Sequence, residues 1–170
     1  MIRRKKGQEE IVGFILIVVI IAIAFVVFLG IKLRNPEPAQ RESEILYQFI
    51  ESSMEQTTDC AIRENSKNLA LNELIRECHS FNNTCFNGEG SCAEAEKTIR
   101  NILKSAWTVG PDNVYKGYEF NAEYHYNLSS EINERFISIA EGNCTNNFVG
   151  NSYFIPEFPG NIVVQAKLCS

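Results

Sequence analysis

Clustered basic residues are scarce in most of this 170-residue chain. The chain has 16 lysines and arginines and 21 aspartates and glutamates. Six of the bases and two of the acids lie in residues 1–34, so residues 35–170 keep 10 bases and 19 acids, a net charge of −9. Nucleic-acid binding requires clustered Lys and Arg side chains that contact phosphates. No basic stripe interleaved with aromatic residues follows residue 35, so we expect no nucleic-acid partner.

The common catalytic and metal-binding motifs are also lacking. The chain contains no G-x-S-x-G, no P-loop, no H-E-x-x-H and no convincing carboxylate pair. Its cysteines lack the C-x-x-C spacing that is typical of zinc and redox sites. A thiol nucleophile needs a paired base, and the only histidines are His79 and His125. We therefore expect no enzymatic activity, no cofactor and no metal.

Charge is absent from residues 11–31, IVGFILIVVIIAIAFVVFLGI. As a helix, these residues span about 30 Å, the thickness of a bilayer core. The run is longer than the apolar part of an ordinary signal peptide, and Lys32 and Arg34 follow it instead of a small-residue cleavage site. The rest of the chain is too short to bury a helix that is apolar on all sides. The run therefore predicts a single membrane-spanning helix.

The flanking charges predict its orientation. Four bases precede the apolar run and two follow it, which favours a cytoplasmic N-terminus and places residues 35–170 outside. All cysteines and all N-glycosylation sequons follow the run, as expected for an oxidising, extracytoplasmic region. The glycosylation candidates are Asn82, Asn127 and Asn143.

Six cysteines predict three disulfides, with 15 pairings possible. The cysteines are Cys60, Cys78, Cys85, Cys92, Cys144 and Cys169. We expect one bridge within residues 78–92, one that ties Cys60 to the helical region, and one that ties Cys169 into the domain. A region this small needs such cross-links.

The residue pattern of 35–170 predicts helices followed by strands. Prolines at positions 36 and 38 predict a break or kink after the membrane helix. Apolar spacing then predicts helices over about 45–54, 66–78 and 91–109, the last starting with a Ser91–Glu94 capping box. Alternating polarity predicts strands over 118–127, 135–140 and 162–168. The expected fold class is α+β, with a small helical region packed on a short antiparallel sheet.

The N-terminal sequence RRKKGQEEIVGF, followed by the apolar run, resembles the class III signal peptide of archaeal type IV pilin-like proteins. The resemblance implies that a prepilin-type peptidase cuts between Gly7 and Gln8. It divides the chain into a basic leader (1–7), a transmembrane and polymerisation helix (8–34) and an outer, disulfide-stapled α+β region (35–170). It also implies a pilin-like fold, in which the long N-terminal helix continues into the helical region.

In that family, the apolar helices of many subunits pack together as the core of a filament. Small residues that permit close helix approach are Gly13, Ala22, Ala24 and Gly30. The expected function is therefore a structural or accessory subunit of a type IV pilus-like surface filament, with the membrane, the peptidase and other pilin-like subunits as partners. The alternative is an uncleaved single-pass surface protein whose outer region binds a ligand or partner.

Overall fold

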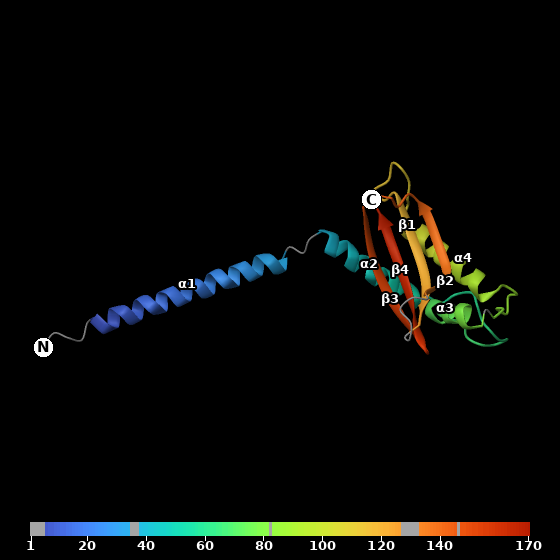
Figure 1. Ribbon diagram of the computed structural model, residues 1–170, viewed down its shortest axis with the longest axis horizontal. Helices are drawn as coiled ribbons and strands as arrows, with labels where there is room; N and C mark the ends of the chain where they lie inside the picture. The colour runs from blue at the N-terminus through green and yellow to red at the C-terminus, as the bar shows by residue number, and fades with distance from the viewer. Residues whose placement is uncertain (1–5, 35–37, 82, 127–132, 146) are drawn as a thin grey trace. The chain divides into compact units, whose positions relative to one another are not determined.

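The computed structural model describes residues 6–34, 38–81, 83–126, 133–145 and 147–170. The chain divides into two compact units, Met1–Arg41 and Glu42–Ser170. We call the second unit the head. Figure 1 labels the helices and strands of both units.

The first unit contains helix α1, Lys6–Arg34. Its segment Val12–Gly30 has a mean hydropathy of 3.5 and is long and apolar enough to cross a membrane. The large apolar side chains of this segment are 41–68% exposed, on all sides of the helix. Among the described residues, no protein element covers them, which is the pattern of a helix that needs an apolar environment from outside the chain.

Three described helices follow α1 along the chain. Helix α2 spans Pro38–Met54, α3 spans Leu71–Ser80 and α4 spans Ser91–Ala106. Each turns one apolar stripe inward. The buried side chains are Leu46, Ile50 and Met54 in α2, Leu71, Leu74, Ile75 and Cys78 in α3, and Ala95, Ile99 and Leu103 in α4.

The start predicted for the second helix was wrong, because α3 begins at Leu71 and not near residue 66. The residues before it use their backbone groups in other contacts. The Leu69 N–H donates to the Cys60 carbonyl at 2.8 Å, and Thr57 and Ala70 form a β-bridge. The helix begins where the Glu73 carboxylate accepts the Ala70 N–H at 3.0 Å.

The capping box predicted for the third helix was also wrong. The residue that precedes α4 is Gly90, which makes no side-chain cap. Ser91 already lies in the first turn, where its hydroxyl is buried, and Glu94 bonds Lys97 instead of the helix start. The helix ends at Ala106, three residues before the predicted end at about 109.

The described strands form one antiparallel sheet in the order β2-β1-β4-β3. Their bounds are Gly117–His125 for β1, Asn133–Gly142 for β2, Phe148–Glu157 for β3 and Gly160–Cys169 for β4. The α+β class is therefore confirmed, and three of these strands overlap the predicted ones. The edge strand β3 was not predicted, and Tyr126 follows β1 instead of lying within it.

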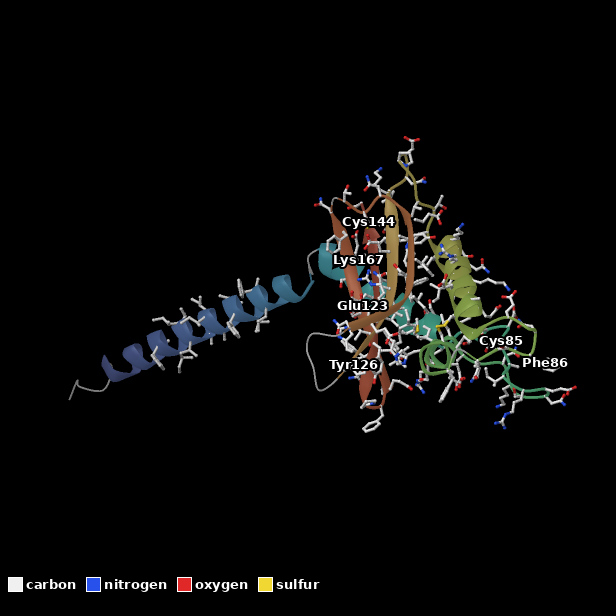
Figure 2. All side chains as sticks on the ribbon, turned by 45° about the vertical axis from the view of Figure 1, so that its right-hand side comes forward. Cys85, Phe86, Glu123, Tyr126, Cys144 and Lys167 are labelled. Carbon is white, nitrogen blue, oxygen red and sulfur yellow. A yellow bond between two sulfur atoms is a disulfide. The ribbon has the colours of Figure 1, made fainter. Side chains whose placement is uncertain are left out.

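The core of the head lies between this sheet and the helices. Alternate residues of β1 and β4 face inward and join the apolar stripes in one contiguous cluster. Three disulfides tie its margins together: Cys60–Cys85, Cys78–Cys92 and Cys144–Cys169. Cys85 and Cys144, from two of these bridges, lie at separate places on the head (Figure 2).

Candidate functional site

The exposed apolar segment of α1 is the first candidate site. At about 100° per residue, Gly13 and Ala24 lie within about 20° of each other on one side of the helix. By the same geometry Ala22 lies opposite Gly13, and Gly30 lies on a third side. A methyl group added at Gly13 or Gly30 would meet nothing within 4 Å. The predicted small residues therefore do not form one stripe, and the helix offers shallow places on several sides.

The residues of the predicted processing site lie at the start of the same helix. Gly7 and Gln8 are the second and third residues of α1. They immediately follow Lys6, and two acidic residues, Glu9 and Glu10, separate them from the apolar run that begins at Ile11.

The predicted glycosylation residues are only partly described. Asn82 and Asn127 lie outside the described residues. Asn143 follows β2 and is exposed, and its side-chain oxygen accepts the Thr145 N–H at 3.0 Å. The intervening Cys144 is bonded to Cys169, so this sequon lies on a cross-linked turn.

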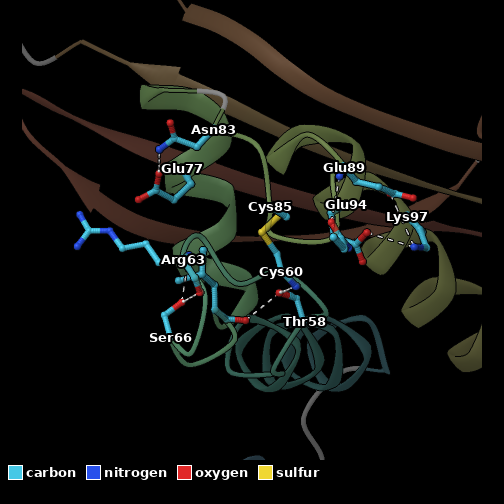
Figure 3. Close-up of a disulfide and its surroundings, with 12 residues drawn as sticks. Thr58, Cys60, Arg63, Ser66, Glu77, Asn83, Cys85, Glu89, Glu94 and Lys97 are labelled. Atoms are coloured by element: carbon cyan, nitrogen blue, oxygen red, sulfur yellow. Dashed lines mark hydrogen bonds and ion pairs between the residues drawn. A yellow bond between two sulfur atoms is a disulfide. The ribbon is translucent and has the colours of Figure 1, made fainter.

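All six cysteines are paired, and each pair joins separate segments of the chain. Cys78–Cys92 is the bridge expected within residues 78–92, and it joins α3 to α4. Cys60–Cys85 joins the loop after α2 to the loop between α3 and α4 (Figure 3), and Cys144–Cys169 ties the end of β4 to the loop after β2. These pairs act as cross-links of the head.

The two histidines take part in packing and surface contacts. The ring of His79 stacks on Tyr124 with a centroid distance of 4.2 Å and an interplanar angle of 15°. His125 Nε2 lies 3.6 Å from a carboxylate oxygen of Glu123 on the same strand. Within the described part of the chain, no group of three His, Cys, Asp or Glu residues is placed to hold a metal ion.

A groove in the head is the second candidate site. It has a volume of about 490 Å³ and runs between one face of α4 and the segment 49–59. At one end it is lined by Phe49, Ile102 and Ala106, and at the other by polar and charged side chains that include Asp59, Glu94 and Lys97.

A buried carboxylate lies beside this groove. Glu94 is 1% exposed, and its Oε2 accepts a 3.1 Å hydrogen bond from Lys97 Nζ. The Lys97 ammonium also lies 3.8 Å from Glu89 (Figure 3). The hydrogen bond with Glu94, the largest cause, and the two nearby carboxylates raise the pKa of Lys97 above its ordinary value. The ammonium therefore stays charged and balances part of the negative charge here.

Sequence reasoning missed this groove. The one sequence feature that bears on the groove is the polar face of α4, on which Lys97, Thr98, Asn101 and Ser105 recur at helical spacing. Such a face is ordinarily a solvated one. Only the fold shows that residues 56–59 form a second wall opposite to it.

No protein-family model matches the chain, and no curated protein is similar to it.

Proposed function

We propose that the protein is a structural or accessory subunit of a type IV pilus-like surface filament. A prepilin-type peptidase removes residues 1–7, and the mature chain assembles through α1. One observation carries the proposal: a basic leader that ends in Gly7 leads directly into a helix whose apolar side chains are exposed from Val12 to Gly30.

Leader removal provides a physical route from membrane to filament. Arg3, Arg4, Lys5 and Lys6 hold the N-terminus at the cytoplasmic face, because charged side chains cross the bilayer core at high cost. A cut after Gly7 removes all four charges. The helix can then leave the lipid and bury its apolar surface against the helices of other subunits.

The proposed topology follows from the same features. The N-terminus lies in the cytoplasm, α1 spans the membrane once, and the head lies outside, either at the membrane or on an extracellular filament. The disulfides of the head fit this placement, since they persist in oxidising compartments.

The direct test is the intact mass of the protein extracted from its native membrane. We expect a chain that starts at Gln8, and we expect Gly7→Leu to block the cut while the control Gly13→Ala leaves it unchanged. A chain that starts at Met1 or Ile2 would overturn the proposal.

The groove in the head favours a second candidate function, an uncleaved single-pass surface protein whose head binds a ligand. In that case α1 is only an anchor, and another apolar sequence in place of residues 11–31 would preserve function. In a filament subunit, the same exchange would abolish assembly.

A further inference from the structure

Filament assembly through α1 makes no use of the groove between α4 and residues 49–59. We propose that this groove binds a neutral oligosaccharide. The inference goes beyond the proposed function, because the groove lies entirely within the head and is present whether or not α1 polymerises.

The groove has the length and regularity that a linear chain of sugar rings requires. One wall is a single face of α4, formed by residues at positions i, i+3, i+4, i+7, i+8, i+11 and i+12 from Glu94 to Ala106. This face is about 18 Å long at 1.5 Å per residue. The volume of about 490 Å³ also lies within the usual range of small-molecule sites, about 300–1,000 Å³.

Unused polar side chains line both walls. The side chains of Gln56 and Thr57 on one wall, and of Thr98 and Asn101 on the other, make no hydrogen bond within the described part of the chain. Amides and hydroxyls both donate and accept hydrogen bonds. Such groups match the hydroxyls of a sugar, which also do both.

The apolar end of the groove provides a surface for a sugar ring. The Phe49 ring lines the groove and packs on Trp107 with a centroid distance of 4.3 Å, which holds the ring in place. Ile102 and Ala106 continue this apolar patch along α4. The C–H face of a pyranose, or an acetamido methyl group, can bury apolar area there.

The charges at the other end favour a neutral ligand. Asp59 and the buried Glu94 are negative. Among the described residues that line the groove, Lys97 alone carries an ammonium, and it is already paired with Glu94. An anion would therefore meet net negative charge. A cation would have to displace Lys97 from its 3.1 Å contact with Glu94.

The polar wall from the loop is held in place before any ligand binds. The Thr58 N–H and hydroxyl both donate to the Leu69 carbonyl at 2.9 Å, and the next-but-one residue, Cys60, is bonded to Cys85 (Figure 3). A preformed wall lowers the entropic cost of binding. Because a helix face and a cross-linked loop form the groove, it offers no sheet edge on which an extended peptide could pair.

Calorimetric titration of the full-length protein tests the proposal. The protein is kept in a detergent without a sugar headgroup, and triacetylchitotriose and maltotriose are the probes. We expect saturable binding of at least one of them. Asn101→Ala and Thr98→Val should each weaken it about five- to tenfold, as loss of one hydrogen bond predicts. Asn101→Trp, which fills the groove from an exposed helix position, should abolish it.

Matched controls come from the same residue types outside the groove. Gln56→Ala should weaken binding, whereas Gln48→Ala and Asn68→Ala, at exposed positions that do not line the groove, should leave it unchanged. The inference is overturned if neither sugar binds, or if Asn101→Trp and Thr98→Val bind as tightly as the unaltered protein. Binding of a neutral tripeptide or of inorganic phosphate, without a response to either sugar, would also overturn it. Each result leaves the start of the mature chain, and thus the filament proposal, to its own measurement.

Discussion

Tyr118 and Glu141 lie opposite each other in the β1–β2 pair, and the Tyr118 hydroxyl donates a 2.7 Å hydrogen bond to Glu141 Oε2. Lys104 of α4 lies 3.6 Å from the same carboxylate oxygen. Burial, and then the hydrogen bond to Glu141, raise the pKa of Tyr118 to about 12. The hydrogen bond from Tyr118, followed by the charge of Lys104, lowers the pKa of Glu141. The hydrogen bond therefore joins two neighbouring strands, and the Lys104 contact links this pair to the helical layer. The two members of the pair titrate at opposite ends of the pH range.

The pair predicts a loss of stability at both pH extremes. Glu141 releases its proton more readily in the folded state, so its contribution is present above its unfolded pKa of about 4.3 and is lost as the pH falls through the folded value. Tyr118 holds its proton more tightly in the folded state. Its contribution is present below about pH 10 and is lost as the pH rises through about 12.

Urea unfolding of the full-length protein in micelles, followed across pH, checks this expectation. We expect Tyr118→Phe to flatten the pH dependence on both sides, because one partner no longer titrates and the other loses its hydrogen bond. An exposed tyrosine, Tyr126, offers the control Tyr126→Phe. The interpretation is wrong if both variants show the pH profile of the unaltered protein.

The Cys78–Cys92 bridge should contribute measurably to stability. It closes a loop with a sequence separation of 14 and joins α3 to α4. We expect Cys78→Ala with Cys92→Ala to lower the free energy of unfolding by about 3 kcal/mol. Urea titration under non-reducing conditions measures the change, and a loss below about 1 kcal/mol would show that α3 and α4 hold together through packing alone.

A glycine at the end of β2 should tolerate no side chain. Gly142 has φ +79°, and a methyl group there would collide with the Lys116 carbonyl oxygen and approach the Gly117 Cα at 2.8 Å. We expect Gly142→Ala to lower the free energy of unfolding by about 2–4 kcal/mol, from left-handed strain and overpacking together. Gly88→Ala is the matched control, because Gly88 has φ +88° but nothing within 4 Å.

Thermal and urea unfolding of the two glycine variants separate the two causes. The control should cost about 1–2 kcal/mol, the strain alone. If both variants lose the same free energy of unfolding, a small backbone shift must relieve the contact between the added methyl group at position 142 and the start of β1.

The local pattern of apolar and polar residues predicted most of the helices and strands of the head, but it did not predict the edge strand β3. Alternation identified β1 and β4 because both are central strands with one buried face. In β3 the middle residues Gly150, Asn151 and Ser152 break that alternation. Their place is determined by distant contacts: the Ser43 hydroxyl donates to the Gly150 carbonyl at 3.3 Å, and the Asn151 amide donates to the Ser43 carbonyl at 2.9 Å.

The same limit applies to the candidate sites. The apolar segment of α1 was evident from composition, because no tertiary contact is needed to recognise 19 consecutive apolar residues. The groove was not, because its two walls are about 40 residues apart in sequence and neither wall is unusual by itself. Ser91 and Glu94 show the converse error, since a good local capping pattern was overridden when burial directed Glu94 toward Lys97.

The proposed filament assembly should be sensitive to side-chain size on one side of α1. Gly13 and Ala24 lie on the same side and leave a shallow place for a neighbouring helix. We expect Gly13→Leu with Ala24→Leu to reduce filament yield at least tenfold, because two added side chains hold the helices apart. Leader cleavage should persist, since Gly7 and Gln8 are unchanged. The control Val12→Leu with Val26→Leu adds apolar volume at residues that are already large and exposed.

Sedimented filament mass and the intact mass of membrane-extracted protein give the two readings. Filaments at the original yield would show that this side of α1 faces lipid or solvent in the assembly, and cleavage lost with the filaments would place the effect at the peptidase instead of between subunits.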